Sequence, residues 1–109
     1  MIQISTKNEI EEKISTGNPV LIYFSGENCS VCKVLKPKIE EEILKNFPKM
    51  ELFELKTERY KEIASNFSVF SIPTILVFFD SKEFFRKSRN LSVSQFIEEL
   101  RRPYTLFMD

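Results

Sequence analysis

Residues 20–37 read VLIYFSGENCSVCKVLKP, and this stretch decides the fold that we predict. It begins with an apolar run, residues 20–24, which has the pattern of a central strand covered on both faces. The only two cysteines of the chain, Cys29 and Cys32, follow the run and open a long helical stretch. At a helix N-terminus, unpaired backbone N–H groups and the positive end of the dipole favour the thiolate over the thiol.

The spacing of the two cysteines adds to this prediction. Three residues apart, Cys29 and Cys32 lie on one side of the first helical turn, close enough to close a small ring. The thiolate is the form that attacks disulfides. The stretch therefore predicts dithiol chemistry.

Length and composition predict a single domain, residues 1–109, with a core that needs no disulfide staples. The 16 basic and 16 acidic residues balance, so we expect neither nucleic acid nor a membrane as a partner. No run could span a bilayer and no secretion signal is recognised, so we expect a cytoplasmic protein. There, a cysteine pair is more often catalytic or metal-binding than structural. The chain has no histidine, which excludes His-based catalysis within it.

The order of apolar patterns predicts an α/β fold. Alternating or continuous apolar runs indicate strands at residues 2–4, 20–24, 50–55, 74–79 and 83–87. Periodicity and capping residues indicate helices at residues 6–17, 30–46, 58–66 and 92–103. We expect Pro37 to kink the second helix and Pro103 to end the last one, which leaves residues 104–109 as an apolar tail. Such an alternation favours a mixed sheet with helices on both faces.

Three landmarks give the chain a resemblance to the thioredoxin family over nearly its whole length. They are Cys29-Ser30-Val31-Cys32, Pro37 five residues later, and Ile72-Pro73-Thr74 before an apolar strand. The resemblance implies a thioredoxin-like three-layer sandwich, with a central mixed β-sheet flanked by helices. It also implies a kink at Pro37 and a cis peptide bond before Pro73, beside the cysteines.

The resemblance further implies a mechanism. Cys29 would be the nucleophile that attacks a substrate disulfide, and Cys32 the resolving cysteine that releases the reduced substrate. Ile72 and Pro73 would present backbone to an extended substrate segment. No cofactor is implied beyond the redox-active Cys29–Cys32 disulfide. The implied partners are disulfide-containing proteins and a reductase such as thioredoxin reductase, and we expect a monomer.

Departures from the family pattern give three further candidate residues. Tyr23 stands where the family usually buries an aspartate, and Glu54 where it usually has a lysine on the next strand. We hypothesise that Glu54 is a proton relay for Cys32, hydrogen-bonded to Tyr23 and with a pKa raised by burial. The alternative is an exposed glutamate at a strand end. Arg89 stands where the family has a groove-lining glycine, and so becomes a candidate substrate-binding residue.

Two other kinds of function stay open at this level. One is an adaptor or redox-sensing binding module with little turnover, because Asn28 and Val31 differ from the tryptophan and proline usual around the cysteines. The other is a metal site. Since tetrahedral zinc takes four ligands, Cys29 and Cys32 would have to share the ion with a second copy of the chain.

Overall fold

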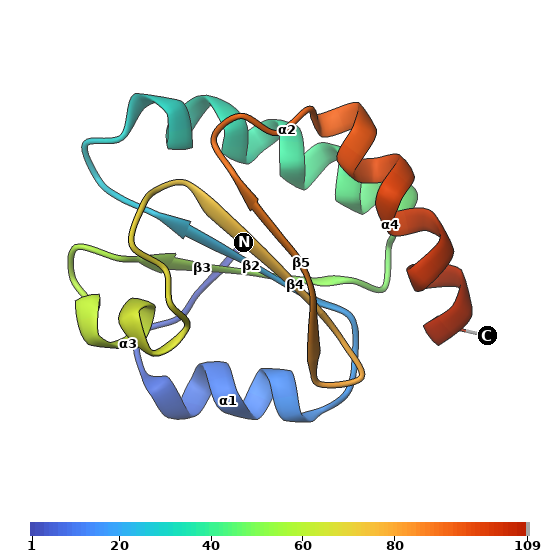
Figure 1. The fold of residues 1–109 in the computed structure, drawn as a ribbon, viewed down its shortest axis with the longest axis horizontal. Coiled ribbons are helices and arrows are strands. Elements are labelled where there is room, and N and C mark those ends of the chain that lie inside the picture. The colour runs from blue at the N-terminus through green and yellow to red at the C-terminus, as the bar shows by residue number, and fades with distance from the viewer. Residues whose placement is uncertain (109) are drawn as a thin grey trace.

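Figure 1 shows the computed structural model, which describes residues 1–108, as a sheet with helices on both faces. Its strands are β1 (Ile2–Gln3), β2 (Val20–Ser25), β3 (Glu51–Lys56), β4 (Thr74–Phe79) and β5 (Lys82–Ser88). Its helices are α1 (Lys7–Ser15), α2 (Ser30–Asn46), α3 (Lys61–Asn66) and α4 (Val93–Met108). The strands lie in the order β1-β3-β2-β4-β5. β1, β3 and β2 run parallel, and β4 is antiparallel to both β2 and β5.

The two central strands explain why the apolar runs are continuous. Every residue of β2 and β4 is buried, because α2 and α4 cover one face of the sheet and α1 and α3 the other (Figure 1). Alternate residues of each strand therefore enter different cores: Leu21 packs with Ile39 of α2, and Ile22 packs with Ile10 of α1. The predicted three-layer α/β sandwich is confirmed.

Local signals place the helix ends. The Thr6 hydroxyl accepts a hydrogen bond from the Glu9 amide at 3.1 Å and so caps α1. Gly17, with φ of 80°, follows the end of α1 in the left-handed region that favours glycine. Helix α2 has the predicted bounds and contains Pro37. Helix α3 begins at Lys61 rather than at residue 58, because residues 57–59 form a turn whose backbone bonds return to Lys56.

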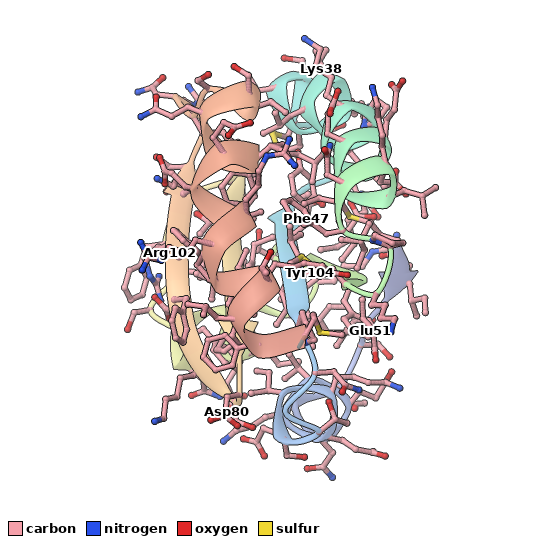
Figure 2. All side chains as sticks on the ribbon, turned by 90° about the vertical axis from the view of Figure 1, so that its right-hand side faces the viewer. Lys38, Phe47, Glu51, Asp80, Arg102 and Tyr104 are labelled. Carbon is pink, nitrogen blue, oxygen red and sulfur yellow. A yellow bond between two sulfur atoms is a disulfide. The ribbon has the colours of Figure 1, made fainter. Side chains whose placement is uncertain are left out.

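The prediction that Pro103 ends the last helix is wrong. Helix α4 continues to Met108, although a proline inside a helix costs about 3 kcal/mol. The Tyr104 ring packs against Phe47, with 4.8 Å between the ring centroids; both side chains are labelled in Figure 2. The Tyr104 hydroxyl accepts a hydrogen bond from the Lys49 amide at 3.1 Å. The Phe107 ring stacks on Phe79 at 5.4 Å. The half-buried Tyr104 ring, its hydrogen bond and the stack of Phe107 on Phe79 act against the cost of Pro103. The expected tail is thus helical to Met108, and Asp109 lies outside the described residues.

Removal of the Tyr104 ring should test this account of α4. We expect Tyr104→Ala to lower the free energy of unfolding by about 2 kcal/mol, because the half-buried ring leaves a gap against Phe47. Tyr104→Phe keeps the ring and should cost about 1 kcal/mol, the worth of the lost hydrogen bond. Urea unfolding measures both values. Equal stability of the alanine and phenylalanine variants would show that the ring does not hold the helix.

No helix within residues 1–108 is long and apolar enough to cross a membrane.

Candidate active site

The two cysteines form a disulfide at the first turn of α2. Their Cα atoms are 5.2 Å apart, within the range that a disulfide requires. Cys29 is the N-cap residue, and its Sγ accepts a hydrogen bond from the Cys32 amide at 3.2 Å. Cys29 is half-buried, whereas Cys32 is only 2% exposed. Cys29 is therefore the more accessible of the two residues.

Tyr23 lies directly beneath this turn. Its hydroxyl donates a hydrogen bond to the backbone carbonyl of Cys32 at 2.8 Å, in a fully buried setting. Burial, and then the charge of Glu54, raise the pKa of Tyr23 far above its ordinary value, so the phenol stays neutral and keeps its proton to donate. The expected hydrogen bond between Tyr23 and Glu54 is not formed. Its donor is engaged by the carbonyl of Cys32 instead.

Glu54 is buried, which rules out the exposed alternative. It pairs in register with Tyr23 on the neighbouring strand and is 1% exposed. Its carboxylate accepts hydrogen bonds from Gln3 Nε2 at 2.5 Å, Ser25 Oγ at 2.7 Å and Lys36 Nζ at 2.8 Å. Lys56 Nζ lies 3.3 Å from Glu54 Oε2, the oxygen that Ser25 also contacts. The carboxylate thus lies between two cations and two neutral donors.

These contacts reverse the expected pKa of Glu54. Burial acts to raise the pKa, but the hydrogen bonds from Lys36, Ser25 and Gln3, together with the charge of Lys36, lower it from 4.5 to about 2. The hypothesis of a raised pKa is therefore wrong, because it considered burial without the donors. An ionised carboxylate that is paired in this way is a poor base near neutral pH.

The loop before β4 brings Ile72 and Pro73 to the dithiol end of the sheet. The Ile72–Pro73 peptide bond is cis, Pro73 is buried and Ile72 is half-buried. Gly26, in the loop that precedes the cysteines, makes room for Ile72: a Cβ atom on Gly26 would lie 2.6 Å from Ile72 Cδ1. The two loops therefore pack closely, and the absence of a side chain at residue 26 permits it.

Arg89 lies on the other flank of the dithiol. It is exposed, in the turn between β5 and α4, and lines an open hollow with Val31 and Val34 of α2. The structure thus brings Arg89 close to the first turns of the helix that carries Cys29 and Cys32, and it leaves Glu54 and Tyr23 below those turns.

Sequence reasoning missed the contact of Lys36 with Glu54, and it missed Phe70. Lys36 is the closest cation to Glu54, and its place one helical turn after Cys32 could have indicated that it faces the sheet. Phe70 is 82% exposed and borders a hollow with Ile72. The exposure of Phe70 could have been predicted, because this phenylalanine lies in a segment without strand or helix periodicity and so is not directed into the core.

Within residues 1–108, no three His, Cys, Asp or Glu side chains gather closely enough to hold a metal ion.

A CxxC disulfide at the N-terminus of a helix, beside a cis-proline at the end of a mixed sheet, defines a thiol–disulfide oxidoreductase of thioredoxin-like fold. The sequence model of the Thioredoxin family matches residues 1–102. The chain belongs to the thioredoxin family.

Two relatives illustrate this membership. The thioredoxin-like protein YdfQ of Bacillus subtilis is 34% identical over 98 residues, which are 90% of this chain and 87% of that protein. A thioredoxin of Chlamydia muridarum is 34% identical over 83 residues, 76% of this chain and 79% of its own.

Solved structures show the same fold. A mutant thioredoxin from Halobacterium salinarum superposes with a TM-score of 0.81 at 19% identity, over 95% of this chain and 89% of that one. The thioredoxin of Fasciola hepatica superposes with a TM-score of 0.77 at 26% identity, over 98% of this chain and 99% of that one.

Proposed function

We propose that this protein reduces disulfides of client proteins by dithiol exchange through Cys29 and Cys32. The observation that carries the proposal is the unequal access to the two sulfurs, with Cys29 half-buried at the N-cap of α2 and Cys32 buried behind it. The protein acts in the cytoplasm as a monomer of one domain, residues 1–109. The dithiol is the only redox group that the reaction needs in this protein. Because each turnover leaves it oxidised, its electrons come from a flavoprotein such as thioredoxin reductase.

The reaction runs in two exchanges. The Cys29 thiolate attacks one sulfur of the client disulfide, a mixed disulfide forms, and the second client sulfur leaves as a thiolate that takes up a proton. Cys32 then loses its proton and attacks the Cys29 sulfur, which re-forms the Cys29–Cys32 disulfide and releases the second thiolate of the client. The client gains two electrons and two protons, and the reductase restores the dithiol.

Neighbouring residues hold this geometry. Tyr23 is a positioning residue, because its hydrogen bond to the Cys32 carbonyl fixes the first turn of α2 on the sheet. Glu54 positions α2 through its ion pair with Lys36. An ion-paired carboxylate of low pKa is a poor proton acceptor, so the proton of Cys32 passes to the departing client thiolate or to water. Backbone of Ile72, before Pro73, receives an extended client segment, as a sheet edge receives an added strand.

A turbidity assay tests the proposed function. The protein is added to a substrate protein that precipitates when its disulfides are reduced, with dithiothreitol as the electron donor. We expect turbidity to rise much faster than with dithiothreitol alone, and the Cys29→Ser variant to give only the background rate.

The second candidate function is a thioredoxin-like adaptor or redox sensor with little turnover. It is favoured by the cation at Arg89 and by Val31, because together they change the surface around the cysteines. A wild-type rate no higher than that of Cys29→Ser in the turbidity assay would support this candidate and reject the enzyme.

A further inference from the structure

An open hollow borders the dithiol on the side of Arg89. It lies between the first half of α2 and the segment that leads into α4, which run side by side in Figure 1. Five apolar side chains line it: Val31, Val34, Leu35, Leu91 and Val93. Val34 is 60% exposed, so this apolar surface is left uncovered by the rest of the fold.

The polar part of the lining consists of two cations, Arg89 and Lys38, and two serines, Ser30 and Ser94. Both cations are exposed, and Figure 2 shows Lys38 on the outer side of α2. No carboxylate lines the hollow, and within residues 1–108 neither cation lies within salt-bridge distance of one. Other cations of the protein do pair in this way, for example Lys87 with Glu99 at 2.7 Å. Lys38 also borders a neighbouring hollow that Glu41, Glu42 and Glu98 line, so Arg89 is the cation farther from acidic side chains. The hollow therefore combines apolar contact with two cations that form no ion pair within salt-bridge distance.

We infer that the hollow binds an acidic and apolar segment of the client beside the disulfide under attack. An apolar client side chain covers Val31 and Val34, while Asp or Glu residues next to it face Arg89 and Lys38. The inference rests on the proposed function and adds the substrate class to it. Charge complementarity favours an acidic client segment over a basic one, because an electropositive surface attracts acidic segments and repels basic ones.

The size of the effect follows from the exposure of the two cations. Pairs between exposed charges are weak and screened by salt, so they act mainly on the rate of encounter. We expect a preference for acidic over basic clients of about tenfold at low salt, which falls to about twofold or less near 1 M salt.

Two disulfide peptides test the inference. They share a leucine next to the reactive cysteine and differ only in the neighbouring residues, which are Asp and Glu in one and Lys in the other. The readout is the ratio of the two second-order rate constants for reduction by the reduced protein. In the Arg89→Glu/Lys38→Glu variant we expect this ratio to reverse in favour of the basic peptide. Because the readout is a ratio, a general effect of these charges on the cysteines cancels.

A matched control separates local charge from net charge. Lys49→Glu/Lys82→Glu changes the net charge by the same amount at exposed residues, one after the last turn of α2 and one at the start of β5. This control should keep the wild-type ratio. Equal rates for the two peptides, or the same fall in ratio in both double variants, would overturn the inference.

A small neutral disulfide, hydroxyethyl disulfide, distinguishes failure of the inference from failure of the proposed function. If the protein reduces it and both peptides at comparable rates, the dithiol chemistry stands and the acidic substrate class is wrong. If the reduced protein reduces neither the small disulfide nor the peptides, both the proposed function and the inference are rejected.

Discussion

A Cys32→Ser protein should accumulate covalent adducts with its clients through Cys29. The first exchange needs only the sulfur of Cys29, which is half-buried at the N-cap of α2. The second exchange needs the buried Cys32 sulfur, so its removal stops the reaction at the mixed disulfide. We expect turnover in the turbidity assay to fall to the rate of dithiothreitol alone. Mass spectrometry of the adducts, before and after reduction, identifies the clients and the linked cysteine.

The matched control is Cys29→Ser, which removes the exposed sulfur and keeps the buried one. This variant should form no adducts, because a client disulfide cannot approach a sulfur that is 2% exposed. Recovery of clients linked through Cys32 of this protein would reverse the assignment of the nucleophile and the resolving cysteine.

Glu54→Gln should destabilise the protein strongly at neutral pH and much less in acid. The folded pKa of Glu54, about 2, lies below the ordinary value of 4.5, so the ionised group stabilises the fold above pH 4.5. That contribution is lost as the pH falls from 4.5 toward 2. The shift corresponds to on the order of 3 kcal/mol at neutral pH. Urea unfolding of both proteins at several pH values measures the difference between them.

A glutamate on the same strand provides the control for this effect. Glu51 is only partly buried, and its contact is a 3.4 Å hydrogen bond from Asn18. Glu51→Gln should change the free energy of unfolding by less than about 1 kcal/mol. A Glu54→Gln difference that stays constant from neutral pH down to acid would contradict the low pKa of Glu54.

Local signals predicted most of the fold. Helix α2 and strand β4 have the expected bounds, because capping residues, periodicity and continuous apolar runs depend only on residues close together in the sequence. The end of α4 could not be predicted in this way. A proline normally stops a helix, and the contacts that carry the helix past Pro103 come from Phe47 and Lys49, more than fifty residues earlier in the chain.

The candidate site was likewise predicted only in part. The positions of Cys29, Cys32 and the Ile72–Pro73 bond followed from the motifs and from the family resemblance. The sequence left a buried and an exposed Glu54 as alternatives, which the structure decides for burial, and the predicted sign of the pKa shift of Glu54 was wrong. That sign depends on Lys36, brought by a separate helix to 2.8 Å, and spacing along the sequence does not measure such a distance.

The ion pair of Glu54 with Lys36 also has a consequence for the conditions under which the protein works. Because Glu54 stays ionised and Tyr23 stays neutral throughout the neutral range, neither group beneath the sulfurs changes its charge between mildly acidic and mildly alkaline pH. These two groups therefore give the dithiol a constant electrostatic background over that range of pH.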